Sequence, residues 1–162
     1  MLQFDFERSV GYWVFATAHE MGCAMNEELQ AHGITYRQWE VLAWISYMGE
    51  LSQTDLAERM GIEAPTLVGV LDRMERDGWI QRIQSETDRR KKLIRPTERV
   101  APVWAETVTC ALRVRARATK GLSDEQLRSL RDILAAIRQN LTALPAGAST
   151  SAAPTKDAAI PA

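Results

Sequence analysis

The chain has 162 residues, 46% of them hydrophobic, which is enough for one globular domain with a buried core. Its two cysteines exclude a disulfide framework. We expect a cytoplasmic protein with no membrane segment, because the N-terminus lacks a signal-peptide pattern and no apolar run approaches the ~18 residues of a membrane helix. The formal net charge of -1 excludes a surface that binds polyanions everywhere, so any nucleic-acid surface must be local.

Three helix signals precede residue 62. Apolar residues at helical spacing predict a long first helix that stops near Gly33. A second helix is expected because Thr35 and Gln38 have the spacing of a capping box, in which each side chain binds a free backbone N–H group of the other residue. Ser52 can cap a third, short helix, and Gly61 can end it by adopting the left-handed conformation.

The fourth predicted helix has the features of a helix that reads DNA. Pro65 fits its first turn, where a backbone N–H group is not needed, and Gly78 ends it. Its apolar residues share one face, and the residues off that face are Thr66, Gly69, Arg73 and Arg76. Small residues at the start of the helix allow a close approach to base edges, while the arginines can reach phosphate groups.

Two short antiparallel strands are predicted at 79–84 and 92–95, joined by a long basic loop. Pro96 fits the end of an edge strand, where no ladder donor is lost. The loop places four consecutive cations behind one acid: Asp88, Arg89, Arg90, Lys91 and Lys92. An arginine on a narrow loop suits the DNA minor groove, where negative potential is concentrated, and the aspartate can pair with a neighbouring arginine and fix the shape of the loop.

Two further helices are predicted after Thr97. The first closes at Gly121, and the second begins with a capping box formed by Ser123 and Gln126. Apolar residues recur every three or four positions along the last helix, at Leu127, Leu130, Leu134, Ile137 and Leu141. Such a stripe needs a packing partner. From Pro145 onward the composition predicts a disordered tail, because alanine, serine, threonine and proline bury too little apolar surface.

The order of helix, short helix, glycine turn, helix and hairpin is typical of a winged helix-turn-helix, whose last helix enters the major groove. The residues LSQTDLAERMGIEAPTLVGVLDRMERDGWIQR and then DRRKKLIRPTE resemble the helix-turn-helix and the Asp-x-Arg wing motif of MarR-type transcriptional regulators, most closely the SlyA-like members. The resemblance extends to Leu144. It implies a mainly α fold, about six helices with a two-stranded β wing, in which the N- and C-terminal helices form a dimerisation domain.

The resemblance also implies partners. We expect an obligate homodimer that represses by binding double-stranded DNA at pseudo-palindromic operators, with a small aromatic or phenolic acid bound between the dimer helices and the DNA-binding lobe. The implied divisions are 1–34 (N-terminal dimerisation helix), 35–98 (winged helix-turn-helix lobe) and 99–144 (C-terminal dimerisation helices), followed by the tail 145–162.

By position, the implied DNA-binding residues are Ser52, Gln53, Ala64, Pro65, Thr66, Gly69, Arg73, Asp88, Arg89, Arg90 and Lys91. The resemblance makes Arg90 the minor-groove arginine and Asp88 its orienting partner. Gly69 stands where close relatives often have an arginine that reads a base.

Cys23 is a candidate redox residue. His19, Cys23 and Glu27 share one face of the first helix, and His19 is the sequence-local group that could polarise a reactive thiolate. A metal site is not expected, because no second cluster supplies further ligands. A redox- or metal-responsive regulator through Cys23 stays an alternative. Cys110 lies among apolar helix positions and is most simply a core residue.

Other features leave the function open to a second class. Four tryptophans could either line a ligand cleft or fill the core: Trp13, Trp39, Trp44 and Trp104. A second basic run on the predicted fifth helix, at Arg113, Arg115, Arg117 and Lys120, fits a solvated face or an intersubunit salt-bridge partner. The sequence contains no recognisable catalytic motif or cofactor-binding motif, so we predict a protein that is not an enzyme. A winged-helix module that binds a protein partner is the remaining alternative.

Overall fold

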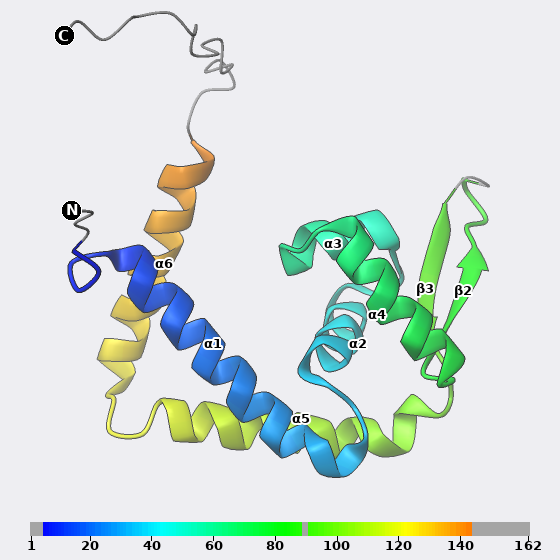
Figure 1. Ribbon diagram of the computed structural model, residues 1–162, viewed down its shortest axis with the longest axis horizontal. Coiled ribbons are helices and arrows are strands. Elements are labelled where there is room, and N and C mark those ends of the chain that lie inside the picture. Colours follow the sequence, from blue (N-terminus) through cyan, green and yellow to red (C-terminus); the bar gives the residue numbers. More distant parts are fainter. Residues whose placement is uncertain (1–4, 89–90, 144–162) are drawn as a thin grey trace, which may run out of the picture. The chain divides into compact units, whose positions relative to one another are not determined.

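The computed structural model describes residues 5–88 and 91–143 (Figure 1). Residues up to Lys120 form one compact unit, and those from Gly121 onward form a second, whose described element is α6. The described elements are α1 (Val10–Leu29), the 3-10 helix η1 (Gln30–His32), α2 (Tyr36–Met48), β1 (Leu51–Ser52), α3 (Gln53–Met60), α4 (Ala64–Arg76), β2 (Ile80–Gln84), β3 (Lys92–Pro96), α5 (Val100–Ala118) and α6 (Asp124–Thr142). None of these helices is both long and apolar enough to cross a membrane. The predicted tail lies outside the described residues.

Local signals fix the helix ends where the sequence predicts them. Thr35 and Gln38 form the capping box at the start of α2, with the backbone N–H of Gln38 donating to the Thr35 hydroxyl over 3.3 Å. Gly33 follows η1 at φ 66° and Gly61 ends α3 at φ 61°, both in the left-handed region that a residue with a Cβ atom rarely adopts.

The helices α2, α3 and α4 share one apolar core with the sheet. Its fully buried side chains include Val41, Leu56, Leu67, Leu71, Met74, Ile80 and Ile94. Burying one such side chain stabilises the fold by roughly 1.5–3 kcal/mol. The positions of α4 that enter this core are Leu67, Val70, Leu71 and Met74, so its opposite face is left for solvent.

The predicted two-stranded hairpin is confirmed as β2 and β3, and a third strand that was not predicted joins it, so the sheet is antiparallel with the order β1-β3-β2. The short strand β1 pairs Leu51 with Ile94, and β2 pairs Arg82 with the same residue. The central position of β3 makes the edge-strand interpretation of Pro96 wrong. Pro96 pairs with Ile80 of β2, and it is tolerated on the β1 side because the pairing with β1 covers only residues 93 and 94.

The helix α1 crosses α5 and packs against it (Figure 1). Cys110 and Val114 of α5 are buried with Met25 and Leu29 of α1, so Cys110 is a core residue as predicted.

The second unit contains α6, which opens with the predicted capping box of Ser123 and Gln126. None of its residues is buried within the described chain, and Leu141 has 69% of its surface exposed.

Candidate nucleic-acid interface

The exposed start of α4 is the first part of the interface. The helix begins after Glu63, which makes no side-chain capping hydrogen bond, and Ala64, Pro65 and Thr66 are all exposed. The first N–H groups of a helix without a side-chain cap remain available to an anion such as a phosphate. The predicted base-reading residues are therefore accessible, and they lie on a rigid helix.

Gly69 and Arg73 continue the same side of α4. Gly69 is half-buried, and a Cβ atom placed on it would lie 3.7 Å from Nη1 of Arg73, an ordinary contact distance. The guanidinium of Arg73 thus extends beside the glycine. Gly69 adds no side chain to the helix surface here, and the cation of Arg73 is exposed next to it. A helix that approaches bases and phosphates closely needs both features.

Ser52 is placed differently from the other predicted residues. It is buried, with 6% of its surface exposed, and its hydroxyl donates to Oδ2 of Asp55 over 2.6 Å. This hydrogen bond holds the pKa of Asp55 below its usual value. The hydroxyl of Ser52 is therefore engaged in the capping box of α3, and the half-buried Gln53 is the first residue of that helix.

The base of the wing loop is held by backbone hydrogen bonds. The backbone N–H of Ser85 donates to the carbonyl of Lys91 over 3.0 Å, and that of Lys91 donates to the carbonyl of Asp88 over 2.9 Å. Asp88 is half-buried and Lys91 is exposed. Arg89 and Arg90 lie outside the described residues. The loop therefore presents at least Lys91 at its base, close enough to Asp55 to contribute to the lowered pKa of that carboxyl group.

An arginine that the sequence analysis did not select joins the wing to α4. Nη2 of Arg82 in β2 lies 2.7 Å from Oδ1 of Asp72, Nη1 contacts the carboxylate of Glu75, and its backbone N–H donates to Oε1 of Glu75 over 3.2 Å. Burial lowers the pKa of Arg82, but the hydrogen bonds and charges of the two acids outweigh it and leave this pKa raised. The sequence signal was available: two acids three residues apart on a helix, followed by an arginine in the next strand.

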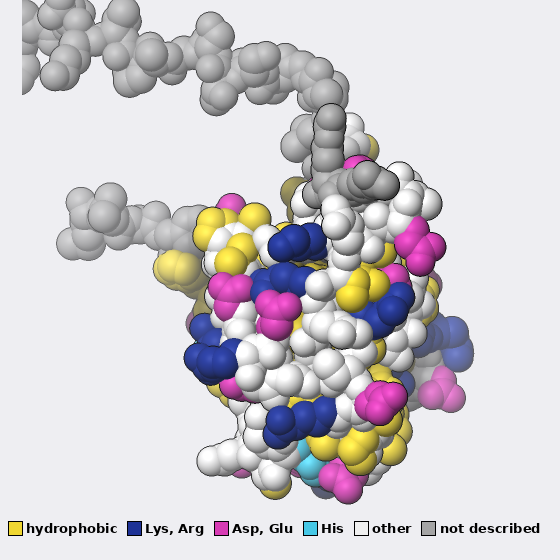
Figure 2. Space-filling view, turned by 90° about the vertical axis from the view of Figure 1, so that its right-hand side faces the viewer, with side chains coloured by type: hydrophobic (Ala, Val, Ile, Leu, Met, Phe, Trp, Pro, Cys, Tyr) yellow, Lys and Arg dark blue, Asp and Glu magenta, His cyan; other side chains and the backbone are white. Residues whose placement is uncertain are grey.

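Charges of both signs cover the wing side of the molecule. Figure 2 views this side and shows, among the residues that the structure describes, Lys and Arg side chains interspersed with Asp and Glu. This distribution agrees with the formal net charge of -1. Among the described residues on this side, a nucleic-acid interface would therefore use individual cations between acids.

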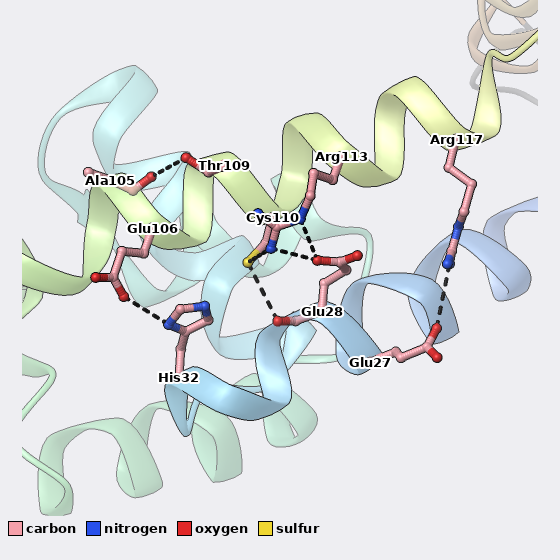
Figure 3. Close-up of polar contacts among 9 residues, drawn as sticks. All are labelled: Glu27, Glu28, His32, Ala105, Glu106, Thr109, Cys110, Arg113 and Arg117. Carbon is pink, nitrogen blue, oxygen red and sulfur yellow. Dashed lines mark hydrogen bonds and ion pairs between the residues drawn. The ribbon is translucent and has the colours of Figure 1, made fainter.

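The second basic run pairs with α1 of the same chain (Figure 3). Nη2 of Arg113 lies 2.7 Å from the carboxylate of Glu28, and Arg117 lies 3.6 Å from that of Glu27. Arg113 also donates to the sulfur of Cys110, over 3.2 Å. Arg113 and Arg117 are half-exposed, and the prediction of a purely solvated face is wrong for both. Their salt-bridge partners lie within the same chain, where an intersubunit partner was expected.

Cys23 is exposed, and its sulfur lies 3.6 Å from Nε2 of His19, one helical turn away. The side chain of Glu27, the third member of that face, points to Arg117 instead. Within the described residues there is no group of three or more His, Cys, Asp or Glu side chains that could hold a metal ion.

A cleft of about 280 Å³ lies between α2, the end of β3 and the start of α5. Its walls are mostly apolar, including Leu42, Ile45, Val100 and Trp104, and its polar groups come from Ser46 and Thr97. None of the described lining residues is charged.

The tryptophans divide between the two interpretations of the sequence analysis. Trp104 lines the cleft and stacks on Trp39, with 6.3 Å between ring centroids. Trp39 packs against the core, Trp44 contacts Tyr47 at 6.4 Å between ring centroids, and Trp13 is exposed. Only Trp104 of the four therefore lines this cleft.

The fold is that of a winged helix-turn-helix protein. The MarR family model matches residues 34–92, the segment from the end of the first helix to the beginning of β3. The matched segment contains all three helices of the helix-turn-helix lobe and the wing loop. The terminal helices lie outside it.

Solved structures share the fold over most of the chain. A MarR-family transcriptional regulator from Rhodococcus sp. RHA1 superposes with a TM-score of 0.73 at 24% identity, covering 83% of this chain and 96% of its own. A mutant MarR from E. coli complexed with operator DNA gives 0.72 at 22% identity, covering 85% and 99%. A probable transcriptional regulator from Pseudomonas aeruginosa gives 0.71 at 22% identity, covering 82% and 99%. The likeness therefore includes the helices that flank the matched segment.

Proposed function

We propose that the protein is a DNA-binding transcriptional regulator of the MarR type, SlyA-like in its wing motif, that acts in the cytoplasm as a repressor by occupying a promoter. One observation carries the proposal: the exposed, small-residue start of α4 lies on a winged helix-turn-helix that has a cationic wing loop. The fold shared with a MarR protein solved in complex with operator DNA supports it.

Each element has a separate role in this proposal. Thr66 and its neighbours at the start of α4 read base edges in the major groove, where the donor and acceptor pattern distinguishes all four base pairs. Arg73 and Lys91 contact phosphates, which supplies affinity without sequence information. Arg90 enters the minor groove and Asp88 orients it. The engaged hydroxyl of Ser52 suggests that Ser52 acts by holding α3 in place.

We further propose that the protein works as a homodimer. Apolar side chains are exposed on both terminal helices, for example Phe15 at 78% and Leu141 at 69%. Exposed large apolar side chains along a helix favour an interaction surface, so burial against a second copy is the simplest explanation. In this proposal residues 1–34 and 99–144 form the dimerisation domain and residues 35–98 the DNA-binding lobe.

The cleft between α2, β3 and α5 is the candidate site for a small ligand. Its volume of about 280 Å³ and its tryptophan wall suit one small aromatic ring. Because none of the described residues that line it is charged, a neutral phenol fits better than an aromatic acid, whose carboxylate would have no oppositely charged partner among them.

DNA selection from random duplexes, followed by gel shifts across a range of salt concentrations, tests the proposed function. A DNA-binding regulator selects a two-fold symmetric sequence and loses affinity steeply as salt rises. If the protein enriches no sequence and its affinity hardly depends on salt, the winged-helix protein-interaction module becomes the better reading.

A redox-responsive regulator remains the second candidate, because His19 lies 3.6 Å from the Cys23 sulfur and Cys23 is exposed. Peroxide should then weaken DNA binding by the wild type and have no effect on Cys23→Ser. Equal responses of the two proteins would remove this candidate.

A further inference from the structure

The ion-pair bridge from Arg82 to α4 belongs to neither the proposed base-reading residues nor the proposed phosphate-binding residues. Arg82 is the most buried member, with 15% of its side-chain surface exposed, while Asp72 and Glu75 are 60% and 41% exposed. One arginine thus contacts two carboxylates of the helix that we propose reads DNA. The two acids are three residues apart and so share the flank of α4 beside β2.

The bridge attaches the hairpin to α4 at a second point, away from the root of the hairpin. The root of the hairpin is already held, because the Thr97 hydroxyl donates to the carbonyl of Gly78 over 2.6 Å and the Thr97 N–H to that of Trp79 over 3.0 Å. Arg82 lies farther along β2, between this root and the loop that begins at Ser85. Because β2 is an outer strand of the sheet, its second edge has no strand partner, and the N–H of Arg82 on that edge is bonded to Glu75.

The chemistry of the bridge requires an arginine. A guanidinium offers five N–H donors in a planar fork, so it can contact both carboxylates at once, while a lysine ammonium is a single compact charge. Glu75 receives a second donor from the backbone of the same residue. The bridge therefore fixes both the distance and the orientation between β2 and α4.

Two acids on a helix that binds DNA are electrostatically unfavourable, because phosphates repel them. We propose that Arg82 is a positioning residue for DNA binding: its bridge to Asp72 and Glu75 locks the wing to α4, so that both elements meet the duplex as one unit. This inference rests on the proposed function. It explains why two acids stand on this helix: the gain from holding the wing in place exceeds the cost of their repulsion by phosphates.

Two variants separate the effect of geometry from the effect of charge. The double variant Asp72→Asn with Glu75→Gln removes two negative charges, so electrostatics alone predicts tighter DNA binding. If the bridge positions the wing, operator binding should instead weaken about tenfold. Arg82→Lys keeps the charge and loses the fork, and it should weaken binding by a similar factor. Gln81→Ala, an exposed neighbour in β2, is the matched control and should stay within about twofold of the wild type.

The measurements are fluorescence anisotropy with the duplex selected by the wild type, at a temperature where circular dichroism shows every variant folded, and amide hydrogen exchange of residues 80–84. Weaker binding by both variants, together with faster exchange in β2, supports the proposal. It is overturned if the Asn/Gln variant binds as well as or better than the wild type, or if Arg82→Lys binds normally. A wild type that selects no duplex refutes the proposed function itself, and the exchange data then show separately whether the bridge holds β2.

Discussion

Replacing Gly69 with alanine should stabilise the protein and weaken its binding to DNA. Gly69 lies in the interior of α4 and is not among the glycines with positive φ, so alanine fits its backbone. The new methyl group would lie 3.7 Å from Nη1 of Arg73, which is a normal contact. The full difference in helix propensity, about 0.8–1.0 kcal/mol, should then appear as added stability.

The size of both effects can be stated in advance. For a chain of this length, that gain corresponds to a melting temperature about 2–4 °C higher, measurable by calorimetry or circular dichroism. In the proposed complex the side of α4 that carries Gly69 faces the groove, so a methyl group should hold the helix away from the base edges. A loss of about tenfold in operator affinity, or ~1.4 kcal/mol, is expected by anisotropy titration.

The control is Gly22→Ala in α1, where a Cβ atom would lie 3.5 Å from the Tyr36 ring, also an ordinary contact. This variant should gain similar stability and bind DNA as the wild type does. A Gly69→Ala protein that is more stable and binds operator normally would refute the close approach of α4 at this position. If the Gly69→Ala protein is less stable than the wild type, the expected gain in helix propensity at this position is refuted.

Further outcomes can be checked with simple variants. Lys91→Ala should reduce the slope of log affinity against log salt by about one unit, whereas Thr66→Ala should change which base is preferred and leave the slope unchanged; equal slopes for Lys91→Ala and the wild type would show that this cation does not contact phosphate. Ser52→Ala should cost about 1 kcal/mol at neutral pH, measured by urea unfolding. Because the folded pKa of Asp55 is lowered, the contribution of its carboxylate is complete above about pH 4 and is lost as the pH falls through the lowered value. The stability difference between wild type and Ser52→Ala should therefore narrow under acid conditions to the part that comes from the Asp55 N–H bond to the Ser52 hydroxyl, and a difference that does not narrow would contradict the role of the carboxylate. Deleting the chain after Gly121 should abolish dimers and operator binding together, as followed by analytical ultracentrifugation and gel shift; a monomer that still binds operator normally would contradict the proposed dimer.

The helices were predictable because their signals are local. The capping boxes at Thr35 and Ser123 and the glycine after α3 act within four or five residues, so the sequence pattern contains all the information that these helix ends require. The winged helix-turn-helix followed from the order of these signals, and the structure confirms it.

The features that were missed depend on contacts between distant segments. The strand β1 is two residues long and has no periodicity of its own, and it exists only because Leu51 and Ser52 meet β3. The burial of Ser52 and the bridge of Arg82 to α4 also arise from tertiary packing. A single sequence shows that these residues are polar, but it does not show which polar groups face each other.

The pairing of β1 with β3 has a consequence for how the lobe folds and opens. Leu51 and Ile94 are roughly 40 residues apart, and α3 and α4 lie between them, so the ends of a long loop must meet before this pair forms. Contacts of this separation slow folding compared with the local contacts of a helical hairpin. We therefore expect α3 and α4 to gain structure first and β1 to join last. Partial opening under native conditions should follow the reverse order, with the amides of residues 51, 52, 93 and 94 exchanging before those of the buried face of α4.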